Sequence, residues 1–430
     1  MGTGQNDIAR SCLGDGMPPD AASGSAPTTD DPVPQDPQRQ EGPVEMTRQS
    51  EGRTKRPRLP HRDKHVRIVT IVGARPQFIK AAVVSRAIAQ RNAADGWRIE
   101  ESLIHTGQHF DRNMSDTFFE QMGIPEPARH LGIAGGNHGE MTGRMLVGLE
   151  QALLELAPDR VLVYVDTNST LAGALAAAKL NLPVAHVEAG LRSFNRRMPE
   201  EINRVVADHV SDLLFAPTEV AVRNLVREGL SSERIFRAGD VMYDAMLHYR
   251  PLASERSSIV RRLGLIPKHY VLATVHRAEN TDDPLRLQGI LEGLGRIGQS
   301  MPVICPLHPR TRIALGDNNM LGDVSGGVRF IEPVPYFDMI SLEANAALIA
   351  TDSGGVQKEA YFNQVPCLTM RDETEWVELV EIGANRLVGT DPERIALGFE
   401  EAGVSSIGQT DLYGNGQAAS VILDELLRRT

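Results

Sequence analysis

The 430-residue sequence has few cysteines and no long apolar run. Its three cysteines, Cys12, Cys305 and Cys367, are widely spaced and form no Cys-x-x-Cys pair, which argues against a disulfide scaffold or a structural zinc site. No stretch of about 18 apolar residues could span a bilayer, and the N-terminus lacks the apolar segment of a secretory signal. We therefore expect a cytoplasmic protein with no membrane partner and no metal site.

Positive charge is also scarce. Lysine and arginine number 45 against 56 aspartate and glutamate residues, which gives a formal net charge of −11. This balance argues against a protein held to nucleic acid by its overall charge. A small anionic ligand, gripped by a few local cations, is still compatible with it.

Residues 1–64 differ in composition from the rest of the chain. They are rich in Pro, Ser, Thr, Gly, Asp and Gln and show no helical or strand period of apolar residues. Such a segment cannot bury enough apolar surface to offset the entropy lost on ordering. We therefore predict a disordered N-terminal tail, and we favour a solvated linker over an interaction tail for its basic run at 53–64.

From Val66 onward, short apolar runs rich in β-branched residues alternate with helical stretches. Apolar runs of this kind indicate parallel strands buried on both faces, and their alternation with helices is typical of doubly wound α/β domains. Two such series fit the length, at 65–240 and 241–410. The expected strands are 66–72, 160–165, 183–188, 270–275, 302–307, 347–351 and 366–370.

Ligands of doubly wound sheets bind beyond the carboxyl ends of the strands. The turn after the first expected strand reads GARPQFIK (73–80), in which a glycine turn and a helix start would present free backbone N–H groups to an anion. Arg75 and Lys80 would add positive charge there. The turn matches neither G-x-G-x-x-G nor G-x-x-x-x-G-K-[ST], which removes the main support for a dinucleotide or P-loop site. Taken alone, it fits a structural turn with a surface arginine slightly better.

Acidic residues follow the next strands. Asp166 and Glu188 each close an expected strand, and Glu200 or Glu201 opens a helix. One carboxylate at a helix N-terminus is explained by the helix dipole. Three carboxylates around one crevice would repel one another, and with partial burial this raises some pKa values towards the range useful for general acid–base chemistry.

The second series carries two further candidate sites. His276 and Arg277 follow a strand, although a lone histidine at such a position is more often structural. A Ser-Gly-Gly turn at 353–355 precedes a helix, so that its backbone N–H groups could approach a phosphate. Glu359, one turn into that helix, could accept hydrogen bonds from ribose hydroxyls.

Eight segments, in order over nearly all of 66–390, together resemble the non-hydrolysing UDP-N-acetylglucosamine 2-epimerase family. The resemblance implies two Rossmann-like domains facing across a cleft, as in the glycosyltransferase-B architecture. It also implies a homodimer and a C-terminal helix at 417–429, within the segment 411–430, that returns to the first domain. The segments are GARPQFIK, TGQH (106–109), VDTNST, HVEAGLRS, MPEEINR, VHRAEN, TDSGGVQKEA and RDETEW (371–376).

The resemblance implies interconversion of UDP-N-acetylglucosamine and UDP-N-acetylmannosamine, within polysaccharide biosynthesis. In this family UDP leaves carbon 1 as the carbon 2 proton departs, and UDP is then added back with a proton on the opposite face. No cofactor is needed. The route requires diphosphate stabilisation, an acid and a base near carbon 2, and exclusion of water.

Matched residue by residue, the implied catalytic positions are Asp166, Glu188, Glu200 and His276. Glu188 and Asp166 would remove and return the proton, Glu200 would be a further acid or orienting group, and His276 would steady the leaving diphosphate. The implied substrate contacts are Arg75, Lys80, Asp166, Glu188, His276, Arg277, Met339, Ser353, Gly354, Gly355 and Glu359.

Several positions depart from better-studied members. Met339 replaces an aromatic side chain and Trp376 replaces an arginine, which puts uracil stacking and part of the nucleotide contact in doubt. Phe110-Asp111 replaces the charged pair associated with allosteric substrate binding. The loop 192–198 and several motifs look closer to a subgroup acting on UDP-2,3-diacetamido-glucuronic acid.

Three alternatives remain open from the sequence. Arg196 or Arg197 could pair with the extra carboxylate of the diacetamido uronate, although the ordinary acetamido sugar is placed slightly ahead. A glycosyltransferase of the same architecture would use the Ser-Gly-Gly turn and Glu359 but would not need the three acids. A non-catalytic nucleotide-sugar sensor would be expected to lose those acids.

Overall fold

The computed structural model describes residues 65–94, 96–108, 122–317, 326–402 and 411–429. The chain divides into two units, residues 1–60 and 61–430, and all described residues belong to the second. The predicted disordered tail and the Phe110-Asp111 pair lie outside the described residues, so the predictions made for them stay untested.

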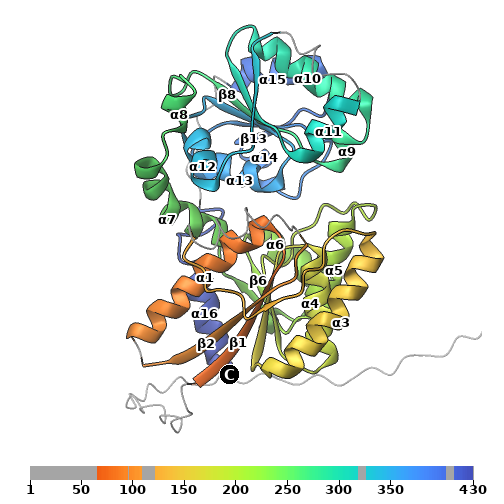
Figure 1. The fold of residues 1–430 in the computed structure, drawn as a ribbon, viewed down its shortest axis with the longest axis vertical. Helices are drawn as coiled ribbons and strands as arrows, with labels where there is room; N and C mark the ends of the chain where they lie inside the picture. The colour runs from red at the N-terminus through yellow and green to blue at the C-terminus, as the bar shows by residue number, and fades with distance from the viewer. Residues whose placement is uncertain (1–64, 95, 109–121, 318–325, 403–410, 430) are drawn as a thin grey trace, which may run out of the picture. The chain divides into compact units, whose positions relative to one another are not determined.

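The first half of the described chain forms a parallel sheet of seven strands with helices on both faces (Figure 1). The strand order β3-β2-β1-β4-β5-β6-β7 reverses direction between β1 and β4, which is where doubly wound sheets bind their ligands. Its strands are β1 (His65–Val72), β2 (Arg98–His105), β3 (Arg129–His130), β4 (Arg160–Tyr164), β5 (Val184–Val187), β6 (Leu213–Ala216) and β7 (Ile235–Arg237).

The helices of this half lie in two layers. Helices α3, α4 and α5 pack side by side, whereas α1 packs against α7. The central strands β4 and β5 are buried along their whole length, as expected when helices cover both faces. The helical segments are α1 (Arg75–Ala94), α3 (His138–Leu156), α4 (Asn168–Lys179), α5 (Pro199–Val210), α6 (Glu219–Arg227), the 3-10 turn η1 (Ser232–Arg234) and α7 (Val241–Arg256).

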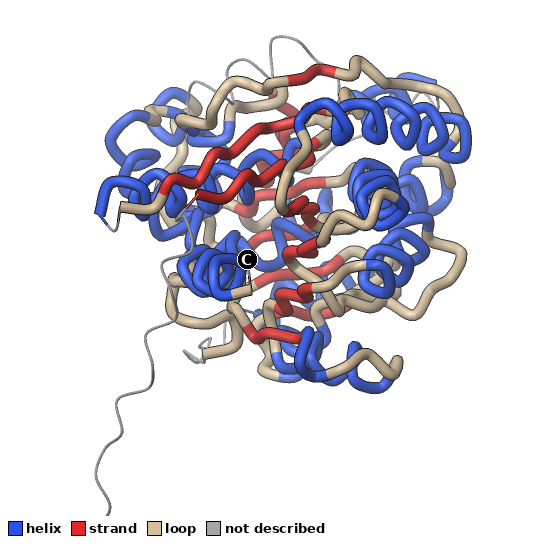
Figure 2. Tube along the Cα trace, turned by 90° about the horizontal axis from the view of Figure 1, so that it is seen from below, coloured by secondary structure: helices blue, strands red, loops and turns tan. Residues whose placement is uncertain are grey.

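The second half forms a parallel sheet of six strands in the order β10-β9-β8-β11-β12-β13. Figure 2 shows strands enclosed by helices in the described chain. Its strands are β8 (Val271–Thr274), β9 (Val303–Pro306), β10 (Val328–Ile331), β11 (Leu348–Thr351), β12 (Cys367–Thr369) and β13 (Asn385–Leu387). Its helices are α8 (Ile259–Arg262), α9 (Ala278–Thr281), α10 (Pro284–Gly298), α11 (Pro309–Asp317), α12 (Tyr336–Asn345), α13 (Gly354–Phe362), α14 (Val377–Glu381) and α15 (Pro392–Ala402).

All seven predicted strands are present, as β1, β4, β5, β8, β9, β11 and β12, so the doubly wound α/β class is confirmed. The last helix, α16 (Ala418–Arg428), returns to the first sheet and packs on α1 and α7, as the family resemblance implied. Asp244 of α7 stabilises the first turn of α16, because its carboxylate accepts the backbone N–H groups of Ala418 at 3.1 Å and Ala419 at 2.9 Å.

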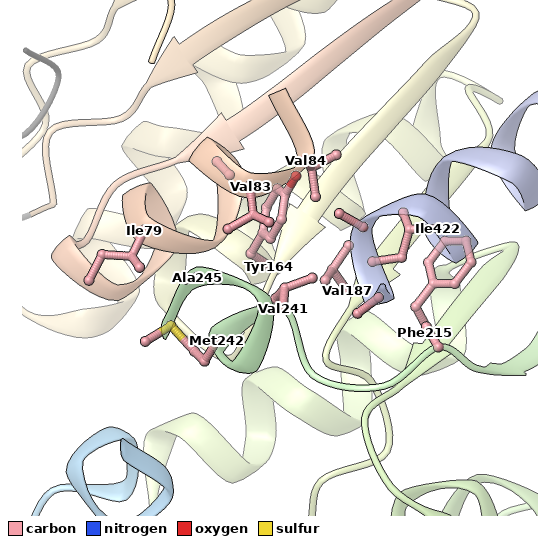
Figure 3. Close-up of a cluster of buried hydrophobic side chains, with 14 of the residues drawn as sticks. Ile79, Val83, Val84, Tyr164, Val187, Phe215, Val241, Met242, Ala245 and Ile422 are labelled. Carbon is pink, nitrogen blue, oxygen red and sulfur yellow. The ribbon is translucent and has the colours of Figure 1, made fainter. Parts of the chain in front are cut away.

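Helix α7 is central to the packing. In Figure 3 its residues Val241, Met242 and Ala245 lie with Val83 of α1 and Ile422 of α16 in one cluster of buried hydrophobic side chains. The same helix also contacts α12 and α13 of the second half. Because one helix packs on elements of both halves, the domain limits at 240 and 410 stay a prediction. None of the described helices is long and apolar enough to cross a membrane.

Candidate active site

Asp166 and Glu188 come from neighbouring strands. Strands β4 and β5 are parallel and pair Tyr164 with Val187, so the residues that follow them reach the same edge of the sheet. Val165 and Glu188 both have a left-handed backbone, with φ of 63° and 72°, a strained conformation that clusters at functional sites. The backbone N–H of Glu188 donates to Phe215 O at 3.0 Å, which fixes this turn. The structure therefore brings the two predicted acids to one sheet edge.

Glu188 is buried between two lysines. Lys80 of α1 donates to Oε2 of the carboxylate, and Lys358 of α13 donates to Oε1 at 2.5 Å. Burial alone would raise the pKa of Glu188, but Lys358 and Lys80 hold it below its ordinary value. Glu188 is therefore a carboxylate in this arrangement, and its pKa is lowered, whereas the sequence analysis expected the clustered acids to include raised pKa values. Lys80, predicted to lie beside the diphosphate, is engaged with Glu188.

Asp166 is held by an arginine. Arg204 of α5 donates to Oδ2 of Asp166 from Nη2 at 2.6 Å and from Nε at 3.0 Å. Asn203 donates to the backbone oxygen of Asp166 at 2.8 Å. Both donors come from one helix, so α5 fixes the backbone and the carboxylate of Asp166 together.

The two glutamates at the start of α5 differ in their surroundings. Glu201 is buried and accepts the backbone N–H groups of Ser193 and Phe194, both at 3.0 Å, as well as Nη1 of Arg204 at 2.8 Å. Glu200 is only half-buried. Glu201 thus anchors the preceding loop, and the role of Glu200 as the additional acid stays a prediction.

A buried acid that the sequence analysis missed fixes the end of β5. Asp208 of α5 pairs with Nδ1 of His186 at 2.7 Å and with Nη1 of Arg192 at 2.8 Å, and accepts the N–H of Gly190 at 3.1 Å. Burial raises the pKa of Asp208, but His186 and Arg192 bring it below its ordinary value. Asp208 therefore braces the turn that carries Glu188.

The first turn differs from the expectation of free N–H groups. Gln77 accepts the N–H groups of Gly73 at 2.8 Å and Ala74 at 3.0 Å, and its own amide donates to Tyr164 O at 2.8 Å. These two N–H groups are not free for an anion, because the Gln77 side chain accepts both, which agrees with the structural turn that the sequence taken alone slightly favours. A Cβ on Gly73 would lie 2.1 Å from Thr106 Oγ1, so packing requires glycine there.

In the second half, Asp352 organises the turn after β8. Its carboxylate is fully buried and accepts the N–H of His276 at 3.0 Å, the N–H of Arg277 at 3.0 Å and the amide of Asn280 at 3.1 Å. No motif pointed to Asp352 except its place before the Ser-Gly-Gly turn. Through it, the end of β11 positions the predicted histidine and arginine.

The His276 ring is 34% exposed and lies 5.3 Å from the His308 ring, centroid to centroid. Its Nδ1 is 3.6 Å from Oδ1 of Asp352. Loss of hydration lowers the pKa of His276, and the positive charges of Arg277 and Arg310 lower it further against the opposite effect of Asp352. The imidazole is therefore biased towards its neutral form before a ligand arrives.

The Ser-Gly-Gly turn opens α13. Ser353 is its N-cap and accepts the N–H of Val356 at 3.5 Å. A Cβ on Gly354 would lie 2.2 Å from Glu375 Oε1, whereas one on exposed Gly355 would meet only Ser353 Oγ at 3.8 Å. Packing therefore explains Gly354 but not Gly355, whose lack of a side chain leaves the helix N-terminus open to a ligand.

Glu359 belongs to a buried acidic pair. Burial raises the pKa of Glu359 and that of Glu343 on α12, and for Glu343 the neighbouring Glu359 raises it further. Arg75 contributes positive charge to this group from α1. Met339, at the predicted uracil position, is half-buried on the same helix as Glu343. The predicted nucleotide residues thus cluster around α12 and α13.

The described residues include no group of three or more His, Cys, Asp or Glu side chains that could hold a metal ion.

Comparison with known proteins gives consistent matches. A model of the family described as UDP-N-acetylglucosamine 2-epimerase matches residues 91–427. The chain is 53% identical over 371 residues to UDP-2,3-diacetamido-2,3-dideoxy-D-glucuronate 2-epimerase of Pseudomonas aeruginosa, covering 84% of this chain and 100% of that protein. It is 36% identical over 377 residues to UDP-N-acetylglucosamine 2-epimerase of Escherichia coli K12, covering 84% and 98%. The crystal structure of Methanocaldococcus jannaschii UDP-GlcNAc 2-epimerase in complex with UDP-GlcNAc and UDP aligns with a TM-score of 0.78 at 43% identity, covering 84% of this chain and 99% of that one.

Proposed function

Because the chain belongs to the UDP-N-acetylglucosamine 2-epimerase family, we propose that it inverts carbon 2 of a UDP-2-acetamido sugar, as in the interconversion of UDP-N-acetylglucosamine and UDP-N-acetylmannosamine. One observation carries this proposal. Two carboxylates, Asp166 and Glu188, reach one sheet edge and are each held by buried cations. The enzyme is an isomerase.

The proposed chemistry starts at carbon 2, whose proton has no adjacent carbonyl to acidify it. Glu188 or Asp166 takes this proton while the electron pair of the C–H bond forms a double bond to carbon 1. UDP departs with the electron pair of the C1–O bond. Reversal with proton delivery to the opposite face inverts the centre. Lys80 and Lys358 keep Glu188 ionised and therefore able to accept a proton, but they also lower its basicity, because they hold its pKa below the ordinary value.

The leaving diphosphate would be steadied by His276, Arg277 and the N-terminus of α13, where the dipole and free N–H groups favour negative charge. Exposed Gly355 supports this placement. Glu359 would hold the ribose hydroxyls and Met339 would lie against the uracil. Glu200 would act as the additional acid or orienting group.

A second candidate substrate is the UDP-2,3-diacetamido uronate that the Pseudomonas aeruginosa relative is named for. The loop 192–198 favours it, because Arg196 and Arg197 are exposed there and could pair with the extra carboxylate. Asn195 of this loop donates to Oε1 of Glu373 at 2.8 Å, so the loop also touches the second half of the chain.

Carbon 2 exchange in deuterated water tests the reaction and the substrate together. Each UDP-sugar is incubated with the enzyme, and deuterium at carbon 2 is followed by proton NMR. Exchange with either sugar, without an acceptor, is expected. Glu188→Gln should lower exchange by about 10²-fold or more, whereas Glu150→Gln, on the exposed face of α3, should not. Near wild-type exchange by Glu188→Gln would sink the central assignment.

The substrate choice has its own control. If the uronate is the substrate, the pair Arg196→Gln and Arg197→Gln should raise its KM and leave the KM for UDP-N-acetylglucosamine unchanged. Exchange with only the diacetamido uronate would overturn the ordinary sugar as first choice. Consumption of UDP-sugar only when an acceptor is added would instead support a glycosyltransferase.

The finer attributes are proposed from family membership. We propose a cytoplasmic homodimer that serves polysaccharide biosynthesis. The buried free thiols of Cys305 and Cys367 fit a reducing compartment. Light scattering tests the dimer, and cell fractionation tests the location.

A further inference from the structure

Lys358 is a buried lysine at the junction of several segments. Its Nζ lies 2.5 Å from Glu188 Oε1 and 2.5 Å from Asp240 Oδ2, and its side chain is 1% exposed. The same Nζ lies 4.2 Å from the centre of the Trp376 ring. An ammonium group loses its hydration on burial, and here two carboxylates and an aromatic face replace it.

The partners of Lys358 come from different parts of the fold. Glu188 follows β5 of the first sheet, and Asp240 is the N-cap of α7, where its Oδ1 accepts the N–H of Met242 at 2.7 Å. Trp376 precedes α14 of the second half. Lys358 itself lies on α13, three residues after Gly355 and one before Glu359.

Resting on the proposed function, we propose that Lys358 is a positioning residue that couples the nucleotide-binding end of α13 to the ionic state of Glu188. This role follows from the ammonium bridging Glu188 and Asp240.

The coupling has a simple electrostatic basis. Lys80 and Glu188 both belong to the first half, so their contact does not depend on α13. Lys358, by contrast, lies on α13, and its ammonium group contacts Glu188 from the second half. A displacement of α13 on nucleotide binding would change the distance between Nζ and Oε1, and a change in the separation of two buried charges alters their attraction more than it would in water. Nucleotide occupancy and the proton affinity of Glu188 would thereby be linked.

Other charged groups share this environment. Lys80 faces Glu188 from α1, and Asp240, Glu359 and Glu378 face Lys358 from α7, α13 and α14. Asp240 competes with Glu188 for the same ammonium. The strength of the Lys358 contact with Glu188 therefore depends on both carboxylates.

The experiment removes the ammonium and reads the ionisation of Glu188. In Lys358→Met, the pH midpoint of the acid limb of kcat should rise by about 1–2 units, because one of two cations has gone. KM should change less than kcat, and Lys358→Arg should restore much of the wild-type midpoint. Lys179→Met, an exposed lysine of α4, is the matched control and should not move it.

A second variant guards against misfolding. Lys358→Met alone leaves Asp240 and Glu188 without their shared cation, so the double variant Lys358→Met with Asp240→Asn removes one charge of each sign. Thermal melting tests whether it folds, and its midpoint should also rise, by less than in Lys358→Met because the negative charge of Asp240 has been removed too. Wild-type midpoints in both Lys358→Met and the double variant would overturn the proposal.

The ionisation of Glu188 can also be read without turnover. Infrared pH-difference spectra of the unliganded protein, assigned by the band lost in Glu188→Gln, should show protonation at higher pH in the double variant than in wild type. If wild type exchanges no UDP-sugar, the proposed function fails, and these spectra still test the Lys358 contact. Identical infrared midpoints in wild type and the double variant would overturn the coupling on their own.

Discussion

Arg204 gives two hydrogen bonds, from Nη2 at 2.6 Å and Nε at 3.0 Å, to one oxygen of Asp166. Its remaining Nη1 donates to Glu201 at 2.8 Å, and Glu201 in turn holds Ser193 and Phe194 of the preceding loop. One guanidinium thus orients a proposed proton-handling carboxylate and the anchor of a loop beside it. Burial lowers the pKa of Arg204, but Asp166 and its other acidic neighbours raise it above its ordinary value.

Arg204→Lys tests whether this orientation matters. Lysine keeps the charge but cannot donate two hydrogen bonds in a fixed plane. The carboxylate of Asp166 would then lose its paired donors and be free to rotate. We expect kcat to fall about 10- to 100-fold, with a smaller change in KM. Arg223→Lys, on the exposed face of α6, is the control and should leave both constants unchanged. Unchanged kcat in Arg204→Lys would show that the paired donors do not position Asp166.

Gly354 and Gly355 are predicted to respond differently to alanine. Gly354→Ala places a methyl group against Oε1 of Glu375, only 2.2 Å away, and should lower the melting temperature. Gly355→Ala meets no atom closer than 3.8 Å and should fold normally. If the α13 N-terminus binds diphosphate, Gly355→Ala should weaken UDP binding about 10-fold or more, because its methyl occupies the approach to the N–H groups. Calorimetric UDP titration and thermal melting measure the two effects.

UDP binding should become tighter as pH falls. Loss of hydration and nearby arginines lower the pKa of His276 in the free protein, so its imidazole is neutral near pH 7. A bound diphosphate favours the imidazolium, which raises that pKa in the complex. The affinity for UDP should therefore rise as pH falls through the pKa of His276 in the complex. It should level off once pH is below the pKa of His276 in the free protein.

Comparison of variants separates the protonation of His276 on UDP binding from the titration of UDP itself. In His276→Gln the extra pH dependence should disappear, whereas His209→Gln, at an exposed position of α5, should keep it. Titration calorimetry in buffers of different ionisation enthalpy measures the proton uptake. Equal proton uptake by wild type and His276→Gln would rule out His276 as the responsive group.

The strand ends could be predicted because apolar runs and turns are local features. Strands β4 and β5 show continuous buried apolar runs, and the acids that follow them were therefore placed at one edge. Strand β2 was missed because its sequence, RIEESLIH, carries charged residues. One of them, Glu101, accepts the hydroxyl of Thr70 at 2.6 Å, and no local pattern reveals such a cross-strand partner.

The supporting groups of the site depend on contacts between distant segments. Lys358 and Glu188 are 170 residues apart, and His276 and Asp352 are 76 apart. A single sequence shows that each residue exists but not that they meet. The same holds for Gln77, whose side-chain oxygen accepts the N–H groups of Gly73 and Ala74, so these groups are not available to an anion. The candidate catalytic residues could therefore be predicted where they follow a strand end. The buried residues that contact them could not be predicted.

The C-terminal helix α16 is anchored to α7 by the buried carboxylate of Asp244. Burial raises the pKa of Asp244 to about 6, although its bonds to the N–H groups of Ala418 and Ala419 favour the charged form. An unfolded aspartate titrates near 3.9, so as pH falls through the window from about 6 to 4 the folded protein takes up a proton that the unfolded chain does not. Stability should rise in that window by about 3 kcal/mol relative to Asp244→Asn, which cannot titrate.

Urea unfolding at several pH values measures this difference. Asp411→Asn, at an exposed position before α16, is the matched control and should follow the wild-type pH dependence. The comparison of wild type with Asp244→Asn is direct, because these two proteins share every other titrating group, and those contributions cancel in the difference. Parallel curves for wild type and Asp244→Asn from pH 7 to pH 4 would mean that the carboxylate is as well solvated in the folded protein as in the unfolded chain. The junction of α7 and α16 would then not be the dry contact that the burial of Asp244 indicates.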